Sequence, residues 1–239
     1  MISKPLCITA IPLLMLGMSS VQAAEKIGDV EVSANVALTS DYVWRGFSQT
    51  YNKPAIQGGF DLGHDSGVYV GTWASNIRFI PEGQPSDGAQ MEIDAYIGYA
   101  TEFNNGVGVD VGYNYYFYPD AQNDLNYDFG EFYLKGSYRF LTLSYNYAND
   151  FFGNAGKAHY LNLGGEYGLP YDATLSGSIG HQTFKDNSDG DYTDWTIAVS
   201  KSFAGLDFSL AYMDTDVEKA NDSDELAQAR AVFSVSKTF

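Results

Sequence analysis

Ionisable side chains recur along this chain on the polar side of segments in which polar and apolar residues alternate. Acidic residues outnumber basic ones, and the formal net charge is −17. Carboxylates that line an aqueous passage favour cations, whereas a guanidinium can bind an anionic group or pair with a carboxylate. The candidates for this ion chemistry are Asp41, Arg45, Glu92, Asp94, Asp110, Glu131, Lys135, Arg139, Glu166, Asp194 and Arg230.

The alternation predicts the elements that position these groups. In residues 30–44, apolar side chains such as Val32, Val36 and Leu38 share one parity, and polar side chains share the other. Successive side chains of a strand point to opposite faces, so each such segment is a strand with one apolar face. Segments of about ten residues that repeat this pattern as far as Phe239 are typical of a transmembrane β-barrel.

The number and spacing of these segments predict an all-β, antiparallel, up-and-down barrel of about 12 strands. The Asn-Gly turn at residues 105–106 between two alternating runs indicates a hairpin. Short turns alternate with long acidic loops, which places both termini on the periplasmic, short-turn side. The first strand is expected over residues 30–44, and the third over residues 68–77 with Tyr69, Trp73 and Ile77 on its apolar face.

The apolar face could in principle point inward, as in a soluble barrel, or toward lipid. Two features favour lipid: the apolar parity is almost free of charge, and aromatic residues gather at the segment ends, as membrane interfaces select. The expected interface aromatics are Trp44, Trp73, Phe117, Tyr147, Trp195 and Tyr212 at the loop ends, and Phe140, Phe203 and Phe239 at the turn ends.

The amino terminus has the pattern of a secretory signal peptide. Lys4 precedes an apolar run, and small residues surround Ala23, so we expect residues 1–23 to be removed and residues 24–239 to form the barrel. An uncleaved anchor is the alternative. The single cysteine, Cys7, lies in the signal, so the mature chain cannot form a disulfide. Export and a barrel together place the protein in the bacterial outer membrane.

Composition also argues against several functions. The negative charge opposes nucleic-acid binding, which depends on clustered Lys and Arg. None of the three histidines, His64, His159 and His181, shares a catalytic arrangement with a serine, so we expect no enzymatic activity. The acidic run at residues 186–191 departs from a calcium-binding loop because the terminal glutamate is missing. No metal or cofactor is expected.

Several runs in the first third of the chain resemble the TorF family of porins. They are residues 33–42 (SANVALTSDY), 45–46 (RG), 48–50 (SQT), 54–60 (PAIQGGF) and 71–76 (GTWASN). The resemblance is weaker but collinear in the later hairpins. It implies a Gram-negative outer-membrane barrel that conducts small solutes, and it supplies no established substrate. Val43 and Trp44 stand where a polar or aromatic pair is common in the family.

These observations predict a channel for passive diffusion of small hydrophilic solutes with a weak cation preference. The alternative is a closed structural or surface-interaction barrel whose interior charges pair and seal the lumen, because 12 strands lie between filled eight-stranded barrels and open 16–18-stranded porins. For Arg45, a structural ion pair is the more common role. The expected partners are outer-membrane lipids, lipopolysaccharide, small solutes, and the barrel-assembly machinery through the C-terminal strand ending at Phe239.

Overall fold

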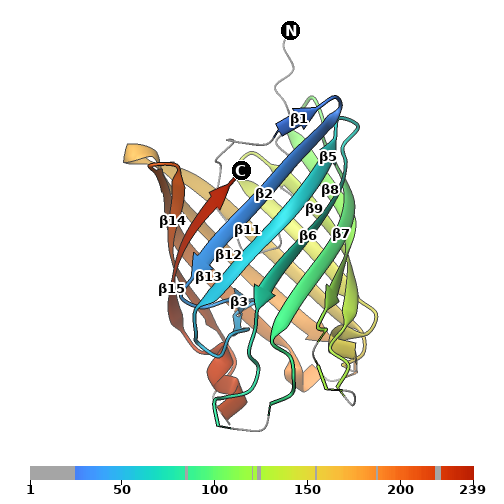
Figure 1. Cartoon of the computed structure of the whole chain (residues 1–239), viewed down its shortest axis with the longest axis vertical. Helices are drawn as coiled ribbons and strands as arrows, with labels where there is room; N and C mark the ends of the chain where they lie inside the picture. Colours follow the sequence, from blue (N-terminus) through green and yellow to red (C-terminus); the bar gives the residue numbers. More distant parts are fainter. Residues whose placement is uncertain are drawn as a thin grey trace.

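The computed structural model describes residues 25–83, 86–119, 121–122, 125–153, 155–186, 188–218 and 222–239. The predicted signal peptide, residues 1–23, lies outside these described residues. Twelve antiparallel strands form the wall of a barrel (Figure 1). They are β2 (Val30–Thr39), β5 (Ala55–His64), β6 (Val68–Asn76), β7 (Met91–Glu102), β8 (Val107–Phe117), β9 (Phe129–Tyr138), β10 (Leu141–Ala148), β11 (Ala158–Leu169), β12 (Ala173–Phe184), β13 (Tyr192–Phe203), β14 (Leu206–Thr215) and β15 (Arg230–Thr238).

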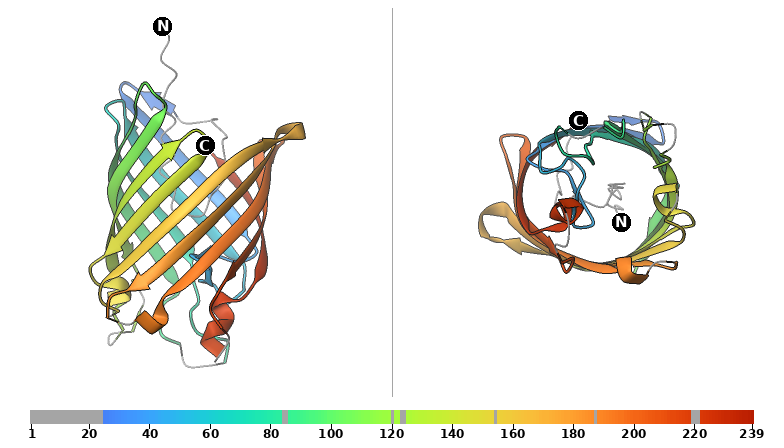
Figure 2. Two further views of the ribbon diagram at one scale, coloured as in Figure 1. Left: turned by 180° about the vertical axis from the view of Figure 1, so that it is seen from behind. Right: turned by 90° about the horizontal axis from the view of Figure 1, so that it is seen from below.

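The barrel is closed by its first and last wall strands. β15 pairs with β2 in a register that runs from Ser234 opposite Thr39 to Thr238 opposite Asn35. The backbone N–H of Phe239 then donates to the carbonyl oxygen of Ala34 at 2.7 Å. Every other wall strand pairs with its sequence neighbours, and Figure 2 shows the resulting ring. The predicted up-and-down barrel of about 12 strands is therefore confirmed.

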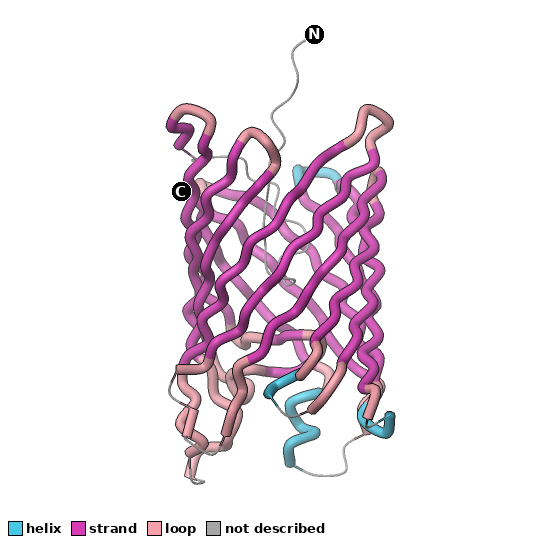
Figure 3. Tube along the Cα trace, turned by 90° about the vertical axis from the view of Figure 1, so that its right-hand side faces the viewer, coloured by secondary structure: helices cyan, strands magenta, loops and turns pink. Residues whose placement is uncertain are grey.

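Connections of two lengths lie at opposite ends of the barrel, and Figure 3 shows the longer ones gathered at one end. At the turn end, Ala204 and Gly205 both have positive φ angles (55° and 77°), which gives a two-residue hairpin turn that matches the strand twist. Short β1 (Glu25–Ile27) pairs with β2 at this end. The four 3-10 helices are η1 (Phe151–Gly153), η2 (Pro170–Asp172), η3 (Ser188–Gly190) and η4 (Asp222–Ala227).

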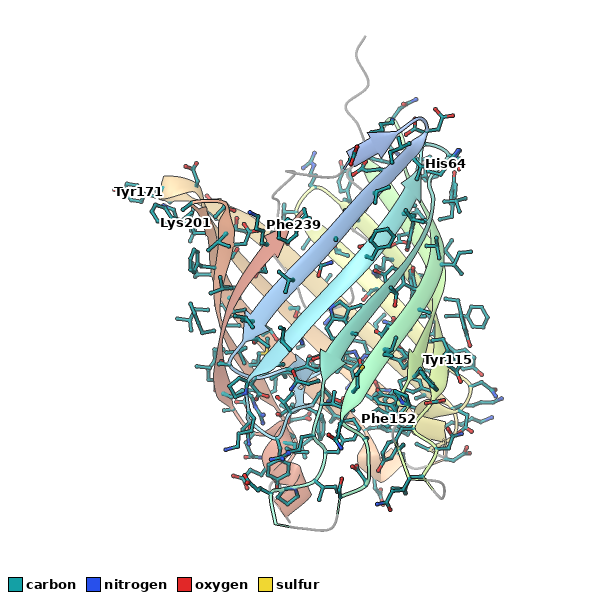
Figure 4. All side chains as sticks on the ribbon, in the orientation of Figure 1. His64, Tyr115, Phe152, Tyr171, Lys201 and Phe239 are labelled. Atoms are coloured by element: carbon teal, nitrogen blue, oxygen red, sulfur yellow. The ribbon has the colours of Figure 1, made fainter. Side chains whose placement is uncertain are left out.

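Every wall strand carries exposed large apolar side chains. Figure 4 shows side chains projecting outward from the barrel wall. Leu38, Ile97 and Leu210 are 60%, 56% and 58% exposed. An apolar surface that surrounds a closed barrel needs hydrocarbon rather than water around it, and closure satisfies the backbone groups between strands. The transmembrane orientation that the sequence predicts therefore holds. None of the described helices has the length and apolar character needed to cross a membrane.

The first strand is shorter than expected, which corrects the prediction of a strand over residues 30–44. β2 ends at Thr39, and the chain then forms a small hairpin from β3 (Val43–Trp44) and β4 (Phe47–Ser48). Arg45 and Gly46 have positive φ angles of 46° and 84°, which turn the chain between the two short strands. The alternation of polar and apolar residues continues into this hairpin, although the hairpin is not part of the barrel wall. The sequence pattern therefore did not reveal the end of the strand.

Two predicted interface aromatics are wrong, because both lie inside the barrel. Trp44 is 9% exposed and belongs to the β3–β4 hairpin. Trp73 on β6 is 6% exposed, and its parity partner Tyr69 is also buried, whereas Val68 and Val70 point outward. Aromatic rings suit a packed interior as well as an interface, and on β6 both parities carry apolar residues, so the local pattern did not separate the faces.

Candidate functional site

The connection between β2 and β5, residues 40–54, is here called the first loop. It lies inside the ring of strands (Figure 2, right). Its residues 41–45 and 48–50 are all less than 10% exposed, unlike an ordinary surface loop. The first loop is therefore packed against the inner wall of the barrel.

A local hydrogen-bond frame holds the shape of the first loop. The carboxylate oxygen Oδ1 of Asp41 accepts hydrogen bonds from the hydroxyls of Ser48, at 2.6 Å, and Thr50, at 2.8 Å. The backbone N–H of Tyr42 donates to the Thr50 hydroxyl at 3.1 Å. One short acidic side chain thus organises both halves of the hairpin, as Asp commonly does in turns.

Arg45 anchors the tip of this hairpin to the barrel wall. Its guanidinium donates to both carboxylate oxygens of Glu131 on β9, at 2.7 and 3.0 Å, and to the side-chain oxygen of Gln182 on β12, at 3.0 Å. It also lies 4.2 Å from the ring centroids of both Trp44 and Tyr160. A planar guanidinium suits this combination of bidentate pairing and aromatic stacking, which an ammonium group cannot reproduce.

The charge of Arg45 persists despite its burial. Burial by itself lowers the pKa of Arg45, but the adjacent Glu131 carboxylate raises it, and the resulting pKa lies above the ordinary value. The Arg45–Glu131 pair is 1% and 3% exposed at its two side chains. Removal of either partner would leave the other charge buried without compensation.

A second ion pair fixes the base of the first loop. The guanidinium of Arg230, at the start of β15, donates to Asp41 Oδ2 at 3.0 Å and to the side chain of Asn52 at 2.5 Å. It also donates to the carbonyl oxygens of Glu225 and Leu226, at 3.0 and 2.5 Å. Arg230 therefore joins the first loop to the last loop, residues 216–229.

The first loop contacts the inner wall on two sides. Tyr42 donates its hydroxyl hydrogen to Glu92 on β7 at 2.8 Å, and the Trp44 ring packs against Tyr116 at 5.7 Å between centroids. On the other side, Val43 joins a buried cluster with Met213 on β14, Val232 on β15, and Ala198 and Ala211. The chain therefore crosses the interior and narrows it near the loop end.

Burial of inward side chains changes along the barrel. Glu92, Asp94, Glu131 and Asp194, in the loop half, are 4% exposed or less. In the turn half, Lys135 and Asp110 lie 3.7 Å apart and their side chains are 24% and 21% exposed. The four acidic side chains near the first loop are thus more deeply buried than the Lys135–Asp110 pair on the turn side.

The structure gathers most of the predicted ionisable residues at the first loop. Asp41, Arg45, Glu92, Asp94, Glu131, Asp194 and Arg230 lie there, and Asp110 and Lys135 lie in the turn half. Glu166 is an exposed residue of β11 near the turn end. Arg139 is corrected: it lies in the turn after β9 with φ 57° and is exposed, because the strand ends at Tyr138.

Several residues that hold the first loop were missed in the sequence. Tyr160 and Gln182 contact Arg45, and Gln182 is fully buried. Tyr42, within the first loop, donates to Glu92 on β7. The parity of Gln182 marks it as inward-facing, but a single amide on a strand carries no further signal. The interface aromatics with outward, exposed or half-buried side chains are Phe117, Tyr147, Trp195, Tyr212, Phe140, Phe203 and Phe239.

Comparison with solved structures shows the same fold in outer-membrane channels. The KdgM porin in complex with disordered oligogalacturonate has 9% identity and a TM-score of 0.54, with coverage of 87% of this chain and 98% of that chain. The NanC porin has 10% identity and a TM-score of 0.52, with the same two coverages. The COG4313 outer membrane channel from Pseudomonas putida F1 has 10% identity and a TM-score of 0.50, with coverage of 93% and 100%.

Sequence comparison adds a family assignment. No curated protein matches this chain. Residues 23–239 match the model of a family described as a bacterial protein of unknown function, and this chain therefore belongs to the Gcw_chp family.

Proposed function

We propose that this protein is a porin-like channel in the outer membrane of a Gram-negative bacterium and that small hydrophilic solutes diffuse through it passively. The observation that carries the proposal is the first loop, which crosses a charged interior and forms a constriction held by the Arg45–Glu131 pair. An apolar outer surface and a polar interior are what a water-filled passage through a membrane requires. The fold shared with porins supports the same function.

The charge balance at the constriction supports a weak preference for cations. Glu131 pairs with Arg45, and Asp41 pairs with Arg230. Within the described parts of the chain, no cation pairs with Glu92, Asp94 or Asp194. Carboxylates without counter-charges beside a narrow passage attract cations and repel anions. The excess of negative charge at the constriction would oppose the passage of a polyanionic sugar, such as the oligogalacturonate present in the KdgM complex.

The experiment that tests conduction is a recording from the purified barrel in a planar lipid bilayer. We expect discrete open currents and, across a potassium chloride gradient, a reversal potential displaced toward that of potassium. The triple variant Glu92→Gln, Asp94→Asn, Asp110→Asn removes three interior charges, so its reversal potential should move toward zero. An unchanged reversal potential would refute the cation assignment while leaving conduction itself intact.

A closed structural or surface-interaction barrel is the second candidate function. The observation that favours it is the dense packing of Trp44 with the rings of Phe129 and Phe151 at the loop end. A folded, heat-modifiable barrel that carries no current would support this function. In that case a variant that replaces residues 43–48 with two glycines should begin to conduct, because the segment that crosses the interior is gone. Equivalent replacement of Ser188–Gly190, outside the first loop, should leave the barrel silent.

The surroundings of the barrel are part of the same proposal. Membrane lipids and lipopolysaccharide would contact the outward side chains, and the assembly machinery would bind the C-terminal strand that ends at Phe239. The sequence runs that resemble the TorF family of porins imply the same location and function.

A further inference from the structure

The outward face of the β11–β12 hairpin changes from apolar to basic at its loop end. Leu161 and Ile179 lie on this face and are 51% and 52% exposed. His181 lies opposite Leu161 in the ladder, and His159 precedes Leu161 by two positions. Side chains two positions apart on a strand share a face, so both histidines point outward. The apolar surface of this hairpin therefore ends in two histidines.

Two lysines extend the same face by one further pair. The backbone N–H of Lys185 donates to the carbonyl oxygen of Lys157 at 2.9 Å, just beyond the ends of β12 and β11. The adjoining pair points inward, because Ala158 is 1% exposed and Phe184 packs against the buried ring of Phe151. Since side chains alternate along the ladder, the two lysines point outward, as the histidines do.

The two lysines face each other without a counter-charge from the protein. Like charges directly opposite in an antiparallel pair are destabilising. Neither lysine takes part in an ion pair among the residues that the structure describes. Asp150 and Asp191 accept the backbone N–H groups of Gly156 and Phe184, at 3.2 and 2.7 Å. Asp186 has the inward parity, and its carboxylate lies beside Gly156. An anionic ligand would offset the repulsion between the lysines.

Both histidines are oriented by hydroxyl groups of neighbouring strands. Nδ1 of His159 lies 2.6 Å from the Tyr145 hydroxyl, and its ring packs against Tyr147 at 5.2 Å between centroids. Nδ1 of His181 lies 3.1 Å from the Thr193 hydroxyl. Because Nδ1 is used in both contacts, Nε2 is the ring nitrogen that remains to donate a hydrogen bond to a ligand.

We propose that these four side chains bind the phosphate groups of a lipopolysaccharide molecule in the outer leaflet. The basic site consists of Lys157, His159, His181 and Lys185. The inference rests on the proposed outer-membrane location, with the loop end facing outside. Ammonium groups and imidazole N–H groups bind phosphate oxygens.

The position of the basic site favours a lipid headgroup over free phosphate. Its basic groups lie directly beyond the exposed side chains of Leu161 and Ile179, along which the acyl chains of the same molecule would lie. Tyr145 and Tyr147 flank the site, and tyrosine is enriched where headgroups meet hydrocarbon. A phosphorylated glycolipid carries both the negative charge and the acyl chains that this surface fits.

Titration of the purified, folded, full-length barrel with bisphosphorylated lipid A in a zwitterionic detergent tests the basic site. Native mass spectrometry counts the bound lipid. The double variant Lys157→Gln, Lys185→Gln should raise the dissociation constant by about fivefold for each lysine, and thus by about 25-fold. Lys201→Gln is the matched control, since Lys201 is an exposed, outward lysine of β13 at the turn end (Figure 4). This control should bind lipid A as the wild type does.

A gain of charge gives a second, independent test. Thr183 lies opposite His159 on the outward face. The variant Thr183→Lys adds a third ammonium group to the site and should lower the dissociation constant for lipid A by about fivefold. Dephosphorylated lipid A, phosphatidylglycerol and inorganic phosphate are the comparison ligands, and each should bind the wild type more weakly than bisphosphorylated lipid A.

Three outcomes would overturn the proposal. The first is equal affinity of the wild type and the double lysine variant for lipid A. The second is equal binding of dephosphorylated lipid A, which would mean that the acyl chains alone bind. The third is equal or tighter binding of phosphatidylglycerol or inorganic phosphate, which would assign the site to a phospholipid or to the free anion. The double variant should conduct as the wild type does, because both lysines lie outside the lumen, so failure of this site is distinguishable from failure of the proposed channel.

Discussion

At the scale of single residues, Arg45 is a buried charge whose surroundings must compensate it. Its guanidinium satisfies Glu131 and Gln182 and lies between the rings of Trp44 and Tyr160. A buried charge is tolerated only when a partner compensates it, so Arg45 and Glu131 stabilise the first loop only as a pair. The structural role of Arg45 therefore depends on Glu131.

The variant Arg45→Ala should destabilise the barrel by about 3–5 kcal/mol, because it leaves the Glu131 carboxylate buried without a counter-charge. The measurement is urea unfolding in detergent or lipid, followed by heat-modifiable migration on gels. Arg139→Ala is the control, since Arg139 lies exposed in a turn, and its loss should change stability by less than about 0.5 kcal/mol. Equal effects of the two variants would contradict the anchoring role of Arg45.

At the scale of elements, the first loop depends on a glycine that no other residue can replace without strain. Gly46 has a φ of +84°, and a Cβ atom at this position would lie 2.3 Å from the Thr215 Cγ2 methyl on β14. Gly46 thus meets two requirements at once: it supplies the positive φ of the hairpin turn, and its lack of a side chain lets the hairpin lie close to β14. A side chain here would move the whole β3–β4 hairpin away from β14.

The variant Gly46→Ala should therefore shift the first loop and reduce stability by more than the backbone strain alone, which is about 1–3 kcal/mol. Gly106→Ala isolates that strain, because Gly106 has a similar φ of +80° and no atom within 4 Å of the added Cβ. Intrinsic tryptophan fluorescence, to which Trp44, Trp73 and Trp195 all contribute, would report the shift of the first loop, and urea unfolding would report the loss of stability. If both alanine variants unfold at the same urea concentration and have the same fluorescence, the contact of Gly46 with β14 does not hold the first loop in place.

At the scale of the whole molecule, depth in the membrane should control the cost of charge on the outer face. Leu210 and Leu206 lie on the same strand, β14, and share a parity, with Leu210 near its middle and Leu206 at its turn end. Leu210→Arg should cost about 2–4 kcal/mol and Leu206→Arg about 0–1 kcal/mol, because a charge is least tolerated at the bilayer midplane. Folding titrations into lipid vesicles provide the comparison. Equal costs would mean that lipid does not surround this face.

The local pattern of the chain was sufficient to predict the barrel. Alternation of side chains along a strand is a property of near neighbours, and turns such as residues 105–106 act over a few residues. Side-chain alternation and turn residues can both be read from a single sequence. The strand number, the up-and-down order and the outward apolar face could therefore be predicted without knowledge of contacts between distant segments. Closure follows because twelve such strands leave no other way to pair the edges.

Only the tertiary structure decided how the interior is filled. The Arg45–Glu131 pair joins residues 86 positions apart, and the contact of Arg230 with Asp41 spans 189 positions. Alternation through Trp44 looks the same whether the segment continues a strand or folds inward, and Trp73 suits either face. Packing across the barrel selects between these possibilities, because the free energy of a buried charge or ring depends on what lies opposite it, which distant parts of the chain supply.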